Sequence, residues 1–474
     1  MQQNPNSNGY TSRMVPEQRR PPMEAVTTFD EVLLGYDRAA AQAEARRGLG
    51  LAYGAATRGC PFGVDFDRLV PALAEGDFDR AAAVVAEAHP WGGIMGRCCH
   101  KFCEAAMVGA YPEGMEPLNL RTLERAAADH GPPQPTVVEA EPSGKRVAIV
   151  GAGSGGLGTA LGLLRAGHAV TIYDDLRDIG GMLIVGYPNF RMPRDVLRRE
   201  LPIQSPLLHL EFGQPIDRAG LGRLLAEYDA VCLAIGRFRP AAVKIPGDEL
   251  ASVYEGLDFL EAVTLGTPPP IGDTVAVLGA GYTAQDVART ARRLGARCHV
   301  LYRRGPEEMP VAASTRDRFI QMMEREGVPY QWLLTPLRIL GEDGRAVAVE
   351  VQRTRLGPPD ASGRGRPEPT DEPPYLLPVT AVIKAMGQRP DFTLLPDDVH
   401  ANADFVLHVD RHASRRGLFV VGDIAGDVGN DGAFVGGLET AVQMNRYLAD
   451  PAHAWPAVGP DTEVERHRPG HSLE

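Results

Sequence analysis

The sequence predicts an α/β fold in which two Rossmann-like dinucleotide-binding domains follow an α-helical N-terminal domain. Two short apolar strands each lead directly into a glycine-rich turn and a helix, and the first glycines of the turns, Gly151 and Gly279, lie 128 residues apart. The complete pattern occurs twice, which indicates two nucleotide-binding units rather than one unit and a chance match. Ahead of them, apolar residues recur at helical spacing within residues 29–135.

Length and composition bound the class of protein. The chain has 474 residues, enough for about three domains at roughly 150 residues each. Hydrophobic residues are 44% and charged residues 23%, as in ordinary globular proteins. The net charge is −12, so the protein has no positive electrostatic field to attract a nucleic acid, and we expect no nucleic acid partner. The longest uncharged apolar run, residues 147–164, contains six glycines and is interpreted as strand, turn and helix, so no membrane span is expected.

The two ends of the chain are expected to be tails. Residues 1–28 have no apolar stretch of the kind found in signal peptides, and we interpret them as a disordered or partner-draped segment. Residues 451–474 form a second tail. The expected location is cytoplasmic, where thiols stay reduced.

The helical domain, residues 29–135, contains most of the cysteines. Four of the six fall within 44 residues, at Cys60, Cys98, Cys99 and Cys103. In a cytosolic chain such a group favours a metal or cluster site over a disulfide framework.

The first unit has the GxGxxG spacing at Gly151, Gly153 and Gly156. The first glycine makes the tight turn, the second lets the backbone approach a pyrophosphate, and the third lets helix and strand pack closely. The N-terminus of the helix then offers free N–H groups to the phosphates. Asp174 follows the next apolar strand and is placed to accept hydrogen bonds from ribose hydroxyls.

The second unit has the variant GxGxxA, at Gly279, Gly281 and Ala284. Its second strand ends at Arg303 and Arg304, where an acid would otherwise lie. Two guanidinium groups can bind a 2′-phosphate, which favours NADPH over NADH. The alternative is that the two arginines only solvate the end of a strand.

Two dinucleotide sites in one chain imply hydride transfer between two cofactors, and flavin with nicotinamide is the usual pair. We therefore expect the first unit to bind FAD and the second to bind NAD(P)H. The FAD-binding domain is predicted in two parts, residues 136–245 and 385–450, on either side of an NAD(P)H-binding domain at residues 246–384.

Five further stretches make the sequence resemble the small (beta) subunit of glutamate synthase and its relatives, which include the N-terminal half of dihydropyrimidine dehydrogenase. They are IGGMLIVGYPNFRMP at 179–193, LAIG at 233–236, LYRR at 301–304, EMP at 308–310 and IKAMG at 383–387. In that family the first stretch lines the flavin, which implies that Gly181 and Arg191 contact FAD. The LYRR stretch takes the NADPH phosphate. The resemblance also assigns Asp423, after Gly422 at the end of a late strand, to the flavin ribityl chain; the alternative is a simple turn aspartate.

The resemblance implies an iron–sulfur domain at the N-terminus. The family has two 4Fe-4S clusters there, but this sequence lacks the thiolates of one ligand set, where it has Gly48, Leu51, Ala56 and Met107. The other set is kept, and it would hold one 4Fe-4S cluster through Cys60, Cys99, Cys103 and Glu124. A zinc site and an empty, vestigial domain are the competing interpretations. Zinc normally recruits a histidine or a fourth cysteine, and His100 lies beside Cys99, too close for both side chains to reach one ion easily.

The function that follows is an NADPH-dependent FAD and iron–sulfur oxidoreductase subunit, which passes electrons to a partner protein. No catalytic acid or base is expected, because the flavin supplies the chemistry. The resemblance offers as acceptors the glutamate synthase large subunit, a 2-oxoacid oxidoreductase, a pyrimidine-reducing subunit or a ferredoxin-like protein.

Two other functions compete with this one. A flavin disulfide reductase would need a cysteine pair beside the flavin, and no close pair follows residue 103. The other is a cluster-free flavoprotein reductase or an assembly subunit of a larger redox complex, using NADH.

Overall fold

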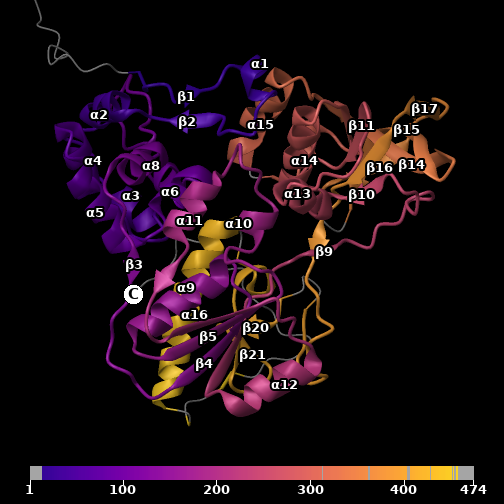
Figure 1. Cartoon of the computed structure of the whole chain (residues 1–474). Coiled ribbons are helices and arrows are strands. Elements are labelled where there is room, and N and C mark those ends of the chain that lie inside the picture. The colour runs from indigo at the N-terminus through magenta and orange to yellow at the C-terminus, as the bar shows by residue number, and fades with distance from the viewer. Residues whose placement is uncertain are drawn as a thin grey trace, which may run out of the picture.

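The computed structural model describes residues 13–311, 313–360, 363–402, 406–427, 429–450, 452 and 455–456. The chain has three regions: a helical N-terminal region, a large mixed sheet flanked by helices, and a second, parallel sheet inserted into the sequence of the first (Figure 1). The predicted α/β architecture is therefore the observed one.

The N-terminal region is a group of short helices around its own core. They are α2 (Arg38–Arg47), α3 (Gly54–Gly59), α4 (Phe66–Glu75), α5 (Phe78–Ala88), α6 (Gly92–Cys98), α7 (Phe102–Ala106) and α8 (Leu120–His130). Asp65 and Asp77 start α4 and α5 by accepting hydrogen bonds from the backbone N–H groups of Arg68 and Arg80. Phe66 begins the apolar face of α4 and is fully buried, because this face packs into the core of the region.

The segment before these helices corrects one prediction. We expected a disordered or partner-draped segment over residues 1–28, but residues 18–19 form β1 (Gln18–Arg19), which pairs antiparallel with β2 (Leu33–Gly35), and α1 (Pro22–Ala25) lies between them. The physical reason is that Glu17 lies buried among cationic groups of the folded domains, which composition does not reveal. Residues 1–12 lie outside the described residues, as does most of the predicted tail at 451–474.

The first large sheet has the strand order β20-β21-β22-β8-β4-β5-β7. Its strands are β4 (Arg146–Val150), β5 (Ala169–Asp174), β7 (Leu208–Phe212), β8 (Ala230–Leu233), β20 (His408–Val409), β21 (His412–Ala413) and β22 (Leu418–Val420). Alternate residues of β4 face opposite ways. Val147 and Ile149 contact α9 (Ser154–Arg165) and α16 (Gly429–Ala449), whereas Val150 packs toward α12 (Arg218–Glu227).

The second sheet has the order β10-β18-β11-β12-β13 and is all parallel. Its strands are β10 (Val253–Glu255), β11 (Thr274–Leu278), β12 (Arg297–Tyr302), β13 (Tyr330–Trp332) and β18 (Ala381–Lys384), with the helices α13 (Gly256–Thr264), α14 (Tyr282–Arg293) and α15 (Ala313–Arg325). One face packs on α13 and α14. The other packs on the antiparallel strands β14 (Leu334–Glu342), β15 (Arg345–Pro359) and β17 (Tyr375–Pro378), and β16 (Gly365–Pro369) pairs with β15.

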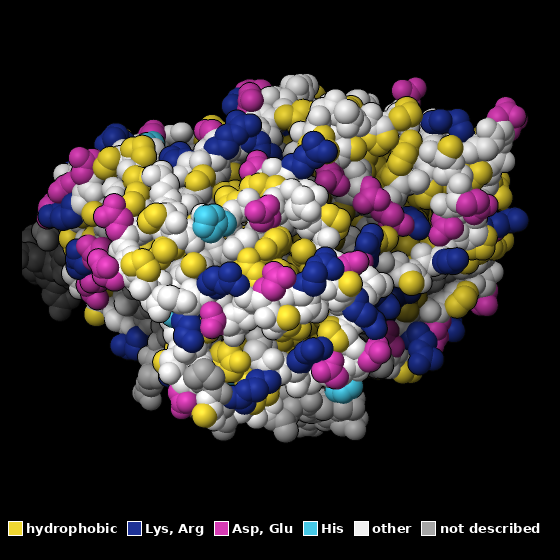
Figure 2. Space-filling model, turned by 60° about the horizontal axis from the view of Figure 1, so that its bottom comes forward, with side chains coloured by type: hydrophobic (Ala, Val, Ile, Leu, Met, Phe, Trp, Pro, Cys, Tyr) yellow, Lys and Arg dark blue, Asp and Glu magenta, His cyan; other side chains and the backbone are white. Residues whose placement is uncertain are grey.

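Short elements complete the frame. They are α10 (Met182–Val185), α11 (Arg194–Glu200), the 3-10 turns η1 (Pro306–Glu308) and η2 (Gly422–Ala425), the pair β3 (Thr136–Val137) and β6 (Ile203–Gln204), and the pair β9 (Arg239–Pro240) and β19 (Gln388–Arg389). The β9–β19 pair lies where the chain passes between the two large sheets (Figure 1). In the described part of the chain, no helix is long and apolar enough to cross a membrane. Figure 2 shows basic and acidic side chains interspersed over one face, with no extended basic area.

Candidate functional site

The glycine turn between β4 and α9 requires glycine at Gly151. Its φ is +113°, and a Cβ atom there would lie 2.3 Å from the carbonyl oxygen of Ala234. Gly156 allows the close approach of the helix, because a Cβ atom there would lie 1.9 Å from the carbonyl oxygen of Gly151. Gly153 is the N-cap of α9, where no side chain caps the helix. The turn can therefore offer backbone N–H groups and the positive helix end to a pyrophosphate.

Asp174, at the end of β5, holds this turn through its carboxylate. Its Oδ2 accepts a hydrogen bond from the backbone N–H of Ala152 at 2.6 Å, and its Oδ1 accepts one from Leu176 at 2.8 Å. Burial raises the pKa of Asp174 above its usual value. A carboxylate has about four acceptor sites, so ribose hydroxyls would share these oxygens with the two backbone donors.

Gly181 and Arg191 come from the stretch expected to line the flavin. Gly181 lies beside the turn, since a Cβ atom there would be 2.9 Å from the Cα of Gly153. The guanidinium of Arg191 lies 4.7 Å from the ring centre of Tyr187 and donates a hydrogen bond to Asp286 on α14. Arg191 thus joins the loop of the first unit to the first turns of the helix in the second unit.

Gly422 and Asp423 begin η2 at the end of β22, next to the end of β8. Gly422 has φ of +78° and donates its N–H to the carboxylate of Asp427 at 2.7 Å. Asp423 is strongly desolvated, and this burial raises the pKa of its carboxyl group, against the opposing charge of Arg237. The structure therefore brings Asp423 to the same edge of the sheet as the first glycine turn.

The second glycine turn, between β11 and α14, repeats the first. Gly279 has φ of +133°, and a Cβ atom there would lie 2.2 Å from the carbonyl oxygen of Ala385. Gly281 is the N-cap of α14 without a side-chain cap, and Ala284 is fully buried in the helix–sheet contact. Both turns leave a backbone surface that fits the pyrophosphate of a dinucleotide, so FAD and NAD(P)H fit the chain.

The two arginines after β12 have different surroundings. Arg304 is buried, and its guanidinium donates hydrogen bonds to Asp360 at 2.5 Å and to the carbonyl oxygen of Gly365 at 2.9 Å. Arg303 is exposed, and partial burial together with the positive charges of Arg304 and Arg364 lowers its pKa. Arg303 is therefore the better placed of the two to receive a phosphate, while Arg304 fastens the β15–β16 hairpin to the strand.

Cys60, Cys99, Cys103 and Glu124 lie on four segments of the N-terminal region that pack against one another. Gly59, beside Cys60, packs against the backbone of Cys103, and α6, which ends just before Cys99, packs along α8, which contains Glu124. Burial raises the pKa of the Cys60 thiol to about 11 and raises the pKa of the Cys99 and Cys103 thiols. The negative charge of Glu124 raises all three pKa values further.

This group fits a cluster better than a single ion. Glu124 is buried, and its Oε1 has no hydrogen-bond partner among the described residues but lies 3.2 Å from Nε2 of His89. Those residues contain no group of three or more His, Cys, Asp or Glu side chains placed to hold one metal ion. In a cubane each ligand binds a different iron, so the ligands lie further apart than around one ion.

The positions that lack the thiolates of the other ligand set are filled by protein. Met107 and Ala56 are fully buried, and Tyr53 donates its hydroxyl to the carbonyl oxygen of Gly48 at 2.8 Å. A Cβ atom on Gly48 would lie 2.1 Å from the Tyr53 hydroxyl oxygen. None of these four residues supplies a thiolate for a second cluster.

One contact that sequence analysis missed links the cysteines to the flavin unit. His100 follows Cys99, and its Nδ1 lies 3.0 Å from both carboxylate oxygens of Asp431, a fully buried residue in the first turn of α16. The carboxylate raises the pKa of His100, against burial. Cys98 and Cys99 also pack against the core of the first large sheet. No sequence signal joins residues 331 positions apart, so only the fold reveals this contact.

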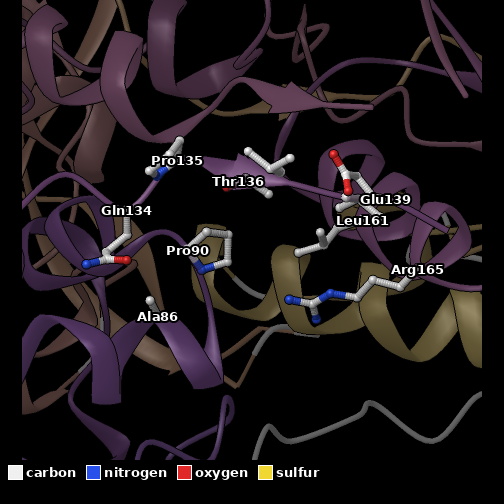
Figure 3. Close-up of a pocket in the computed structure, with 10 residues that line it drawn as sticks. Ala86, Pro90, Gln134, Pro135, Thr136, Glu139, Leu161 and Arg165 are labelled. Atoms are coloured by element: carbon white, nitrogen blue, oxygen red, sulfur yellow. The ribbon is translucent and has the colours of Figure 1, made fainter. Parts of the chain in front are cut away.

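A pocket of about 320 Å³ lies away from both glycine turns (Figure 3). It lies between the linker around Pro135, the end of α5 near Ala86, and Leu161 and Arg165 of α9. None of the predicted site residues lines it.

Comparison with known families gives two matches. Residues 25–134 match the family described as dihydropyrimidine dehydrogenase domain II, 4Fe-4S cluster, and residues 220–446 match the family described as pyridine nucleotide-disulphide oxidoreductase.

Several characterised proteins are similar over most of the chain. The beta subunit of the NADP(+)-dependent formate dehydrogenase of Moorella thermoacetica is 32% identical, over 92% of this chain and 67% of that protein. The beta subunit of the NADPH-Fe(3+) oxidoreductase of Geobacter sulfurreducens is 34% identical, over 72% of this chain and 52% of that protein. The glutamate synthase (NADPH) small chain of Halomonas elongata is 31% identical, over 80% of this chain and 82% of that protein. The chain thus spans about half to two thirds of the first two relatives.

Among solved structures, FprA of Mycobacterium tuberculosis in complex with NADPH superposes with a TM-score of 0.52 at 18% identity, over 66% of this chain and 86% of that one. At this identity the similarity supports the fold of the two dinucleotide-binding units.

Proposed function

The chain belongs to the family of glutamate synthase small chains and related NAD(P)H-dependent flavoprotein oxidoreductases, and on that premise we propose that it conducts electrons from NADPH through FAD and one 4Fe-4S cluster to a partner protein. The proposed acceptor is a catalytic subunit or a ferredoxin-like protein. Relatives named as beta subunits or small chains support the assignment of a partner. The proposed location is the cytoplasm, where thiols remain reduced.

FAD, when bound, exchanges a hydride with nicotinamide on one side and single electrons on the other. The residues of this chain would bind the two cofactors and orient them toward each other. Gly153 and Gly281 would present backbone N–H groups to the two pyrophosphates, and Asp174 and Asp423 would contact the FAD sugar and ribityl hydroxyls. Arg303 would take the 2′-phosphate of NADPH.

The Arg191–Asp286 ion pair would hold the two dinucleotide-binding units in a fixed position relative to each other. Arg191 belongs to the loop that packs beside the first glycine turn, and Asp286 lies in the first turns of α14 after the second. Asp286 is buried and Arg191 is 20% exposed, so removal of Arg191 would leave a buried carboxylate without this ion pair. In this way the chain would hold the ends of the two cofactors toward each other.

The contact between His100 and Asp431 is the observation that carries the proposal. It places Cys99, an expected cluster ligand, directly beside the helix that follows the flavin edge of the first sheet. Electron transfer through protein requires short gaps between centres. The contact therefore supports electron transfer from the flavin to a cluster at the cysteine site.

The test is cofactor analysis of the full chain purified without oxygen. We expect FAD, and iron and sulfide at the ratio of one 4Fe-4S cluster per FAD. NADPH should bleach the flavin absorbance and produce the electron paramagnetic resonance signal of a reduced cluster. A colourless protein without iron would contradict the proposal. A flavoprotein that NADPH bleaches but that contains no iron would contradict the cluster and leave only a cluster-free reductase.

A further inference from the structure

His89 and Glu124 share a buried contact that neither the motifs nor the proposed function assigns. Nε2 of His89 lies 3.2 Å from Oε1 of Glu124, and the two side chains are 1% and 6% exposed. Neither atom has a hydrogen-bond partner among the described residues. Buried polar atoms are rarely left unsatisfied, so each of these two atoms points to the other as its nearest available partner.

The backbone fixes which ring nitrogen of His89 has the proton. The backbone N–H of Trp91 donates a hydrogen bond to Nδ1 of His89 at 3.2 Å, so Nδ1 is an acceptor and is unprotonated. The proton of the neutral ring therefore lies on Nε2, the atom that faces Glu124. Phe62 packs against the imidazole with ring centres 4.2 Å apart and restricts its rotation.

We propose that His89 is a positioning residue for the cluster: it donates Nε2–H to Oε1 of Glu124 and thereby aims the other carboxylate oxygen at the iron site. The inference rests on the proposed function, which makes Glu124 the fourth ligand. A histidine protonated on Nε2 has no lone pair there, so His89 itself is not a ligand. A hydrogen bond to a ligand oxygen also withdraws negative charge from the cluster and raises its reduction potential.

Two substitutions of His89 separate the hydrogen bond from the packing. His89→Phe keeps an aromatic ring against Phe62 but removes the donor, and His89→Gln keeps an N–H donor at a similar reach. We expect His89→Phe to shift the midpoint potential of the cluster to a more negative value or to lower its iron content. His89→Gln should stay close to the unmodified protein. His168→Gln, a buried histidine beside Ser143, is the matched control.

The same comparison in a Glu124→Cys background tests whether His89 acts through Glu124. A thiolate fourth ligand needs no hydrogen bond from His89 to reach the iron. Adding His89→Phe to Glu124→Cys should therefore cause a much smaller shift in potential than adding it to the unmodified chain. Equal shifts in the two backgrounds would overturn the proposal.

A spectroscopic measurement tests the same contact without relying on a shift in potential. Pulsed paramagnetic resonance of the reduced cluster, with 15N-labelled histidine, should detect a weakly coupled nitrogen that disappears in His89→Gln but persists in His100→Gln. A strong coupling, as from a nitrogen bound to iron, or no coupling at all, would overturn the inference. If the unmodified chain contains no iron, the proposed function itself fails; a normal cluster that is indifferent to His89 refutes the inference alone.

Discussion

At the scale of single residues, the charged groups around the second glycine turn divide into those that hold the fold and those that face solvent. Arg304 is buried, and its guanidinium is already hydrogen-bonded to Asp360. Arg303 is exposed, and its neighbours Arg304 and Arg364 are also positive. A phosphate would relieve this repulsion, which is why we place the discrimination between NADPH and NADH at Arg303.

Arg303→Ala should weaken the use of NADPH and leave the use of NADH nearly unchanged. Loss of a charged hydrogen bond is worth about 1.5–3 kcal/mol, or roughly a tenfold to hundredfold rise in KM. Steady-state kinetics with both nucleotides measure this. Arg304→Ala is the comparison: we expect it to lower the melting temperature, because it removes a buried guanidinium that donates hydrogen bonds to Asp360 and to the carbonyl oxygen of Gly365. An equal loss with NADH and NADPH in Arg303→Ala would refute the assignment.

At the scale of the elements, each dinucleotide unit depends on a turn that only glycine can form. Gly151 and Gly279 have the same position in the two turns, both have positive φ, and both approach a neighbouring strand end too closely for a Cβ atom. The chain therefore contains a matched pair of sites in which the same substitution tests two different cofactors.

Gly151→Ala should abolish FAD binding, whereas Gly279→Ala should keep FAD but prevent its reduction by NADPH. Backbone strain alone costs about 1–3 kcal/mol at each site, and the clash with a carbonyl oxygen adds to it. Flavin content and anaerobic reduction are the measurements, with dithionite as the reductant that bypasses the nucleotide. Loss of FAD in Gly279→Ala, with Gly151→Ala unaffected, would reverse the assignment of the two units.

At the scale of the whole molecule, the N-terminal segment fastens the helical domain to both dinucleotide units. Glu17 hydrogen-bonds Thr122 in α8 and pairs with Arg318 in α15, and the backbone N–H of Val32 donates to Phe190 beside the flavin loop. Burial alone would raise the pKa of Glu17, but Arg318, Thr122 and Arg121 lower it from 4.5 to about 2.

Glu17→Gln should destabilise the protein by about 3 kcal/mol at neutral pH. A carboxyl group whose folded pKa is depressed stabilises the fold fully above its unfolded pKa of 4.5 and loses this effect as the pH falls toward 2. The difference in melting temperature between the two proteins should therefore be constant from pH 7 to about 5 and shrink below that. A difference that grows on acidification would contradict the role given to Glu17.

Much of this molecule can be predicted from its sequence because its motifs are local. The α/β class, the oxidoreductase family and the FAD, NAD(P)H and 4Fe-4S cofactor classes are confirmed by the fold and by the relatives. The site residues stay predictions, although the negative charge of Glu124 raises the pKa of each of the thiols of Cys60, Cys99 and Cys103. The order of residues 13–28 could not be predicted, because their own composition is polar and their partners lie far along the chain.

The sequence by itself determined the two glycine turns and the set of thiols, because a turn or a ligand motif needs particular residue types at fixed short spacings. Only the tertiary structure decided which ionisable side chains pair with each other. Arg304 pairs with Asp360, Arg191 pairs with Asp286, and His89 lies against Glu124. Such pairings depend on distances through space between segments far apart in the chain, and burial then sets the strength of each one.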